Sequence, residues 1–167
     1  LLPVNAAVSQ ESVDIKQLKN LADQGNAEAQ YRLGSFYETG QHVEHNFKQS
    51  FEWLKSAAEQ GHRDAQYSLG VKYQYGIGVE GNYLESLRWY GKAANPQNGI
   101  AGDVDKGNKT AQFALAEMYE KGLGVEKNDE QALVNYVRAG MQGHAKAQYR
   151  VAMKHAAGEG VVKDYVK

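Results

Sequence analysis

Hydrophobic and polar positions along the chain follow a phrase that occurs four times. In its clearest form the phrase reads Ala65-Gln66-Tyr67-Ser68-Leu69-Gly70, and related phrases begin at Ala29, Ala111 and Ala147. The intervals between them are 36, 46 and 36 residues, so one unit carries ten extra residues. A fixed period of this length indicates a stacked-repeat architecture, in which each unit buries its apolar face against its neighbours.

Each unit is predicted to contain two helices. In the first unit Ala29, Leu33 and Tyr37 lie four residues apart, which predicts a helix from about Ala27 to Thr39. Each second helix is predicted to start after a good N-cap residue. These residues occupy the same position within each repeat, which we call a register: Asn46, Asn82, Asn128 and Asp164. The apolar stripe expected on the inner side of the second helices comprises Phe47, Phe51, Leu54 and Ala58, then Tyr83, Leu87, Tyr90 and Ala94, then Leu133, Tyr136 and Gly140.

Glycines mark two kinds of position in the repeat. Gly34 and Gly70 lie inside the first helices, where glycine costs stability, so we expect a neighbouring backbone to approach too closely for a Cβ. Other glycines follow the first helices, where a positive φ is easiest for glycine. These are Gly40, Gly76, Gly122 and Gly158, with Gly78, Gly124 and Gly160 two residues later in three units.

The predicted domain organisation is one repeat domain after a short leader. Residues 1–11 read as a flexible leader that resembles the end of an export signal, with a cleavage position before Ala7; a plain disordered leader is the alternative. The chain stops where a second helix begins, so we expect the natural protein to continue. The repeat domain, 12–167, divides into a leading half-unit 12–25, full units 26–61, 62–107 and 108–143, and a truncated unit 144–167, with the insertion at about 95–105.

Composition excludes several classes of function. The net charge is −1, which gives no reason to expect a nucleic acid partner. There is no cysteine, so disulfides, thiolate metal sites and thiol nucleophiles are excluded. No apolar run approaches the roughly 20 residues that span a bilayer, so membrane insertion is not expected.

The repeat phrase, the loop pattern Gly-x-Gly-Val and the run Trp89-Tyr90-Gly91-Lys92-Ala93-Ala94 together resemble the Sel1-like repeat family, a relative of the tetratricopeptide repeat. The resemblance covers about Leu18 to Lys167. It implies an all-α fold, a right-handed α/α solenoid of antiparallel helix pairs, and an adaptor or scaffold that assembles other proteins. Chain-specific departures are His42 in place of the second loop glycine, Asn135 in place of tryptophan, the insertion and the truncated last unit.

Candidate partner-binding residues follow from the geometry of the related repeats, in which the first helices line the concave face. Aromatic side chains stacked along such a groove suit recognition of an extended peptide or helix. Packing of one repeat on the next is the favoured interpretation of the aromatic row, because an amphipathic face is core by default, and the rows of Ser35 and Glu38 are expected to be the exposed ones. The three rows are Tyr31, Tyr67, Phe113 and Tyr149; Ser35, Val71, Glu117 and Met153; and Glu38, Gln74, Glu120 and Ala156.

Catalytic and metal-binding interpretations rest on weaker patterns. Glu117 and Glu120 lie one helical turn apart and could form an acid–base pair, but a solvated helix face explains them as well. His42 and His45 have a metal-ligand spacing in a loop without further ligands. His62 and His144 share one register, which favours a structural role. We expect no catalytic residue, no metal and no cofactor.

The sequence therefore predicts a non-enzymatic interaction module that binds a protein or peptide on its concave face. The resemblance implies an exported bacterial adaptor, periplasmic or secreted, although a cytoplasmic location stays open. Two other functions remain: an envelope-associated hydrolase acting on β-lactam or peptidoglycan substrates, and a structural spacer that forms homo-oligomers through its exposed repeat ends.

Overall fold

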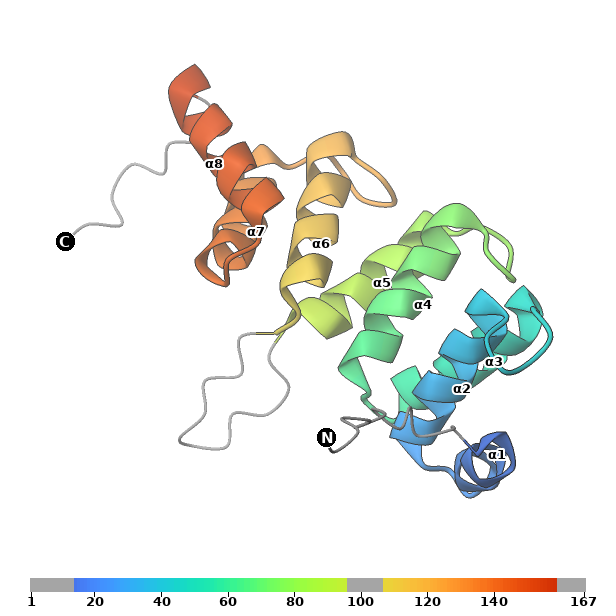
Figure 1. The fold of residues 1–167 in the computed structure, drawn as a ribbon. Helices are drawn as coiled ribbons and strands as arrows, with labels where there is room; N and C mark the ends of the chain where they lie inside the picture. Colours follow the sequence, from blue (N-terminus) through green and yellow to red (C-terminus); the bar gives the residue numbers. More distant parts are fainter. Residues whose placement is uncertain (1–13, 96–106, 159–167) are drawn as a thin grey trace, which may run out of the picture.

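The computed structural model describes residues 14–95 and 107–158, which form eight α-helices and no strand (Figure 1). The leader, most of the insertion and the Asp164 N-cap register lie outside these residues. No helix in the described part of the chain has the length and apolar character needed to span a membrane. The helices are α1 (Ile15–Asp23), α2 (Ala27–Thr39), α3 (Phe47–Glu59), α4 (Arg63–Tyr75), α5 (Tyr83–Ala94), α6 (Lys109–Lys121), α7 (Asp129–Met141) and α8 (Ala145–Ala157).

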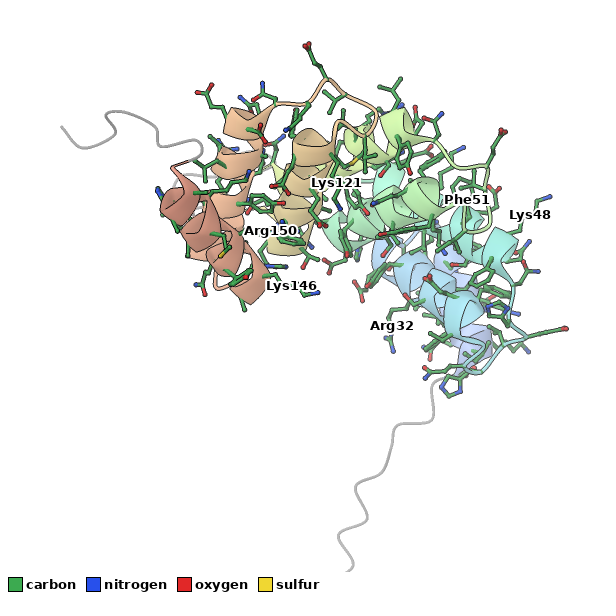
Figure 2. All side chains as sticks on the ribbon, turned by 90° about the horizontal axis from the view of Figure 1, so that it is seen from above. Arg32, Lys48, Phe51, Lys121, Lys146 and Arg150 are labelled. Atoms are coloured by element: carbon green, nitrogen blue, oxygen red, sulfur yellow. The ribbon has the colours of Figure 1, made fainter. Side chains whose placement is uncertain are left out.

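The helices stack in chain order, each packing against the helix before it and the helix after it. Figure 1 shows this stack running from α1 to α8, and Figure 2, seen from above, shows that it bends into an arc. The even-numbered helices are the first helices of the repeat units and the odd-numbered ones are the second. The predicted all-α solenoid is therefore confirmed, with small buried cores distributed along its length.

The predicted helix boundaries rest on caps at both ends. The side chains of Asn46, Asn82 and Asn128 each accept a hydrogen bond from a backbone N–H in the first turn of the following helix. The first helices end on glycines in the left-handed region, with φ between 68° and 71°. Both features were predicted from the repeat register, and Gly40, Gly76, Gly122 and Gly158 occupy the C-cap as expected.

The glutamine of the repeat phrase joins successive units. Gln66 Nε2 donates a hydrogen bond of 3.2 Å to the carbonyl oxygen of Ala58, near the end of α3. The Ala58 carbonyl also accepts a 3.0 Å hydrogen bond from Gly61 N within its own unit, so the glutamine adds a second donor from the next unit. The same bond, 3.0 Å long, recurs from Gln30 to Ala22, from Gln112 to Ala94 and from Gln148 to Gly140.

Gly34 and Gly70 lie at close helix contacts, as predicted, but the prediction that a backbone would be the nearest group was wrong. A Cβ on Gly70 would come within 2.5 Å of the Tyr90 ring, and one on Gly34 within 2.8 Å of the Leu54 side chain. A core side chain, rather than a neighbouring backbone, therefore sets the size limit. The second loop glycines are the ones that meet backbone, because Gly78 packs on the main chain of Phe47 and Gly124 on that of Tyr83.

The predicted inner stripe of the second helices needs a correction at its first position. Phe51 and Leu54 are buried, whereas the side chain of Phe47 is 44% exposed and that of Tyr83 is 47% exposed. Both are the first residues of their helices, and the second loop glycine of the next unit packs on their main chain. Ser50 and Ser86, three residues further along, are buried at the helix contact instead.

The ten extra residues do not disturb the stack on either side. Gly107 has φ of 72°, in the same left-handed region as Gly61, and Asn108 N donates to the carbonyl of Ala93 at 2.9 Å. His62 N makes the equivalent bond to Ala57 in the preceding unit. The backbone therefore enters α6 as it enters α4.

Candidate binding cleft

A cleft of about 470 Å³ opens between α4, α6 and the start of α8, and we call it the central cleft. It brings together five of the predicted binding residues, Tyr67, Val71, Gln74, Phe113 and Glu117. Figure 2 shows Lys146, which also lines the cleft, on the inner side of the arc. The remaining lining residues are Tyr75, Tyr90, Thr110, Ala114, His144 and Ala145.

The aromatic row both packs and faces solvent. Tyr31 stacks on His62 with ring centroids 4.5 Å apart, and Phe113 stacks on His144 at 4.6 Å. Each ring therefore rests on the residue that starts the next first helix. The rings of Tyr31, Tyr67 and Phe113 remain half-buried, while Tyr149 at the end of the stack is 65% exposed.

The two histidines have the structural role that their shared register suggested. The Nδ1 atoms of His62 and His144 accept hydrogen bonds of 3.2 Å from Ala65 N and Ala147 N, so each imidazole is a helix N-cap. Burial, followed by the charges of Lys109 and Lys146, holds the pKa of His144 below its ordinary value of 6.5. The neutral form, which the cap requires, is therefore favoured.

The middle row contributes Val71 and Glu117 to the central cleft. Val71 is half-buried, and Glu117 forms an ion pair of 3.4 Å with Lys121, whose side chain is 53% exposed. Such a pair at the surface is weak. Ser35 is half-buried and donates to the Tyr31 carbonyl at 3.0 Å, whereas Met153 is exposed on α8.

The third row is less exposed than expected, because its polar groups already have partners. Glu38 lies 3.3 Å from the buried Lys72, and Gln74 accepts a 2.8 Å hydrogen bond from the Tyr90 hydroxyl. Glu120 accepts a 2.8 Å hydrogen bond from Tyr136 and lies 2.9 Å from Lys154. These residues join helices to one another, and Ala156, the last of the row, is exposed.

The contacts of Glu120 also bear on the acid–base interpretation. Burial alone would raise its pKa, but the hydrogen bonds from Lys154 and Tyr136 outweigh burial, so the pKa of Glu120 lies below its ordinary value. A general acid needs the opposite shift. Glu120 is therefore held as a charged structural group.

The loop histidines of the first unit turn toward different aromatic rings. His42 packs edge-on against Phe36 at 5.0 Å, and His45 against Phe47 at 4.2 Å. They line a second cavity of about 490 Å³ beside α1. Among the residues that the structure describes, no three histidine, aspartate or glutamate side chains gather as they would around a metal ion.

Sequence reasoning missed Thr110 and Lys146 on the cleft wall. They share a register with Glu28 and Asp64, so one position of the repeat changes from acidic to neutral to basic along the chain. When the residue type at one position differs from copy to copy, the repeat fold does not require a particular side chain there. Such a position can contact a ligand. This variation was the available signal, and it is visible only once the copies are aligned.

Comparisons with known proteins agree with this architecture. The Sel1 repeat profile matches residues 27–62, 63–95, 109–144 and 145–167. A Sel1 repeat protein of Oxalobacter formigenes is 37% identical, with a TM-score of 0.70 over 83% of this chain and 97% of that one. A protective antigen of uropathogenic Escherichia coli strains, displaying an SLR fold, is 30% identical with a TM-score of 0.79; the match covers 87% of this chain and spans only 29% of the antigen's length.

Cysteine-rich protein B of Helicobacter pylori shares the fold at 23% identity, with a TM-score of 0.57 over 80% of this chain and 94% of that one. No match was found among curated proteins. The family profile leaves out residues 96–108, which contain most of the predicted insertion. With four matched copies, the chain belongs to the Sel1 repeat family, whose members generally serve as protein–protein interaction modules.

Proposed function

We propose that the central cleft binds an extended peptide segment of a partner protein. The observation that carries this proposal is the convergence of Tyr67, Val71 and Phe113, from two successive first helices, in one cleft with polar groups at its edge. Binding sites typically combine an apolar, aromatic floor with a few polar groups that fix orientation. The proposed role is that of a non-enzymatic adaptor.

The charged groups at the edge suggest how a peptide is oriented. Glu117 and Lys146 line the same cleft from α6 and α8. Because the partner of Glu117 is an exposed lysine, a cationic side chain of the peptide can replace it at small cost. We expect a segment with an apolar residue over Val71 and Phe113, flanked by residues of opposite charge.

Selection from a displayed peptide library on the immobilised protein tests this proposal. Peptides enriched on the unmodified protein should bind at least tenfold more weakly to a Val71→Arg variant, because the new side chain fills the floor of the cleft. A Glu126→Lys variant, altered at an exposed loop position outside the cleft, should bind them unchanged. Enriched peptides that bind the Val71→Arg variant as tightly as the unmodified protein would place recognition elsewhere.

Export of the adaptor is a separate proposal. It is supported by the small apolar residues before Ser9, and by the description of the E. coli relative as a protective antigen. Mass spectrometry of the mature polypeptide from the envelope and culture fractions of the source cell tests it. We expect an N-terminus at Ala7; recovery of the protein only from the cytoplasm would reject export.

A further inference from the structure

A carboxylate joins the N-terminal ends of successive first helices. His62, the N-cap of α4, contacts Glu28 of α2 through Nε2 and Oε2 at 2.9 Å. Because His62 Nδ1 accepts the Ala65 N–H, the proton of the neutral ring is on Nε2, and Nε2 donates to Glu28. The contact recurs one unit later, where Nδ2 of Asn108, the N-cap of α6, donates to Asp64 Oδ1 at 3.0 Å.

The third contact of this kind, between α6 and α8, lacks its carboxylate. Thr110 takes the register of Glu28, and its hydroxyl oxygen ends two bonds short of where a glutamate oxygen would. His144 keeps the other contacts of this position, because its ring stacks on Phe113 and its Nδ1 caps α8. Within residues 14–95 and 107–158, no hydrogen bond joins His144 Nε2 to an acceptor. Thr110, Phe113 and His144 all line the central cleft.

The charge around His144 favours an added anion. The register that carries acids in the first two units carries Thr110 in α6 and Lys146 in α8. After burial, the charges of Lys109 and Lys146 lower the pKa of His144, and the weaker effect of Glu117 opposes them. The ring therefore lies in a positive environment, at a position where both inner interfaces hold a carboxylate.

We infer that a side-chain carboxylate of the bound peptide, from aspartate or glutamate, accepts the Nε2 hydrogen of His144 in the central cleft. This inference rests on the proposed function, because it names the peptide group that the cleft recognises. Both internal precedents are side-chain carboxylates, which favours this source over a peptide C-terminus. Lys146 supplies the counter-charge, and Phe113 receives an apolar residue beside the acid.

Two displayed peptide libraries on the immobilised protein test the inference. One contains all the standard amino acids and the other lacks aspartate and glutamate; both are fused through their C-termini, so that side chains supply the only carboxylates. The best acid-free peptides should bind about tenfold or more weakly than the best acidic ones. Equal binding would keep the peptide cleft and overturn the carboxylate contact, whereas no enrichment from either library would reject the peptide cleft as well.

Thr110→Glu tests the contact inside the chain. It places on α6 the acid that Glu28 supplies on α2, so the chain should fill the position itself. The NMR signal of the His144 Nε2 hydrogen should then move downfield and exchange more slowly with water. Acidic peptides should bind about tenfold or more weakly. An unchanged Nε2 signal or an unchanged peptide affinity overturns the inference.

Two further substitutions and one control separate the contact from net charge. His144→Asp removes the donor but keeps a cap, as Asp14 caps α1, and should abolish the preference for acidic peptides. Lys146→Glu and Lys48→Glu change the net charge equally. Only Lys146→Glu should weaken acidic peptides, because Lys48 is an exposed residue of α3 outside the cleft (Figure 2). Equal weakening by both would overturn the inference.

The remaining outcome concerns Asp103 and Asp105 of the insertion, which lie outside the described residues. The selection is repeated on an Asp103→Asn, Asp105→Asn double variant, and we expect the same acidic peptides with the same affinity. Acidic peptides enriched on the double variant alone would assign the Nε2 hydrogen to the insertion and reject a partner carboxylate.

Discussion

Two glycines inside helices differ in what their missing side chains avoid. A Cβ on Gly70 would overlap the ring of Tyr90, which is buried and fixed by its hydrogen bond to Gln74. A Cβ on Gly91 would meet nothing within 4 Å. Gly70→Ala should therefore lower the free energy of unfolding by about 1–3 kcal/mol, while Gly91→Ala should raise it by about 0.5–1 kcal/mol through helix propensity.

Urea denaturation of the two variants measures this contrast. Because both substitutions add one methyl group inside a helix, each serves as the control for the other. If Gly70→Ala stabilises the protein as much as Gly91→Ala does, the close contact with Tyr90 does not limit residue size.

A second residue-scale prediction concerns the buried ion pair between Glu120 and Lys154. Glu120→Gln would remove the carboxylate that lies 2.9 Å from the Lys154 ammonium, while Asp129 would stay at 3.7 Å; the Lys154 side chain is only 8% exposed. We expect a loss of about 1–3 kcal/mol in the free energy of unfolding, because a buried charge loses its nearest counter-charge. Chemical denaturation at pH 7 provides the measurement.

Adding Lys154→Met to Glu120→Gln should recover most of this loss. Methionine occupies the same register at Met118, where it is fully buried, so the site accepts its shape. A double variant no more stable than Glu120→Gln alone would mean that the hydrogen bond with Tyr136, rather than the ion pair, carries the stability.

Residue-scale roles were the hardest to predict from the sequence. The repeat alignment identified Gly34 and Gly70 as close contacts, but it could not say that a side chain was the neighbour. The sequence pattern did not single out Lys72 and Lys154, because lysine is seldom buried. Their burial depends on Glu38 and Glu120, one repeat earlier, and such pairs are visible only when the stacking geometry is known.

At the scale of one helix, α8 depends on a cap that protonation can remove. His144 Nδ1 accepts the Ala147 N–H only while it carries no proton. The pKa of His144 is lowered in the folded chain, first by burial, so the unfolded chain binds the proton more readily. Stability should therefore be complete above pH 6.5 and should fall as the pH decreases from there toward the folded-state pKa.

His144→Asn provides the matched control for this pH dependence. Asparagine caps the equivalent helices at Asn26 and Asn108, so the variant keeps a cap that does not titrate. Thermal unfolding between pH 7 and pH 5 should show a smaller loss of stability in the variant than in the unmodified protein. Identical pH profiles would show that the cap at α8 does not depend on imidazole protonation.

Helix existence and caps were largely predictable, because each signal occurs several times in one register. The error at Phe47 and Tyr83 has a simple cause. Periodicity placed both on the apolar face, but they are the first residues of their helices and stay about half exposed; the Phe47 ring meets the Lys72 ammonium of α4 at 5.7 Å instead of an apolar neighbour on that helix. Packing at a helix end depends on the loop of the next unit. The apolar pattern of one helix carries no information about that loop.

For the whole molecule, the insertion should be dispensable for folding. Deleting residues 96–105 would give the sequence Ala94-Asn95-Lys106-Gly107-Asn108, which has the length and glycine position of Ala58-Glu59-Gln60-Gly61-His62. Since the backbone entry into α6 already matches that of α4, we expect a change of no more than about 1 kcal/mol in the free energy of unfolding. Circular dichroism and urea denaturation test this expectation, and a deletion variant with reduced helix content would contradict it.

The candidate site was predictable in part, from the rows of residues at equivalent positions in the first helices. Register analysis supplied Tyr67, Val71 and Phe113, since equivalent positions of stacked helices must lie side by side. It could not supply Tyr90 or Ala145, which come from a second helix and from the start of α8. It also could not show that Gln74 and Glu120 accept hydrogen bonds from the tyrosines of neighbouring helices.

The glutamine bonds between units have a consequence for how the protein responds to its medium. A neutral amide donating to a buried carbonyl is not screened by dissolved electrolyte, whereas the exposed charges at Glu117, Lys121 and Lys146 are. Rising ionic strength should therefore weaken electrostatic recognition in the cleft while the curvature of the solenoid stays the same. The peptide that we propose for the cleft should therefore dissociate at high salt and bind again on dilution, without any change in the fold.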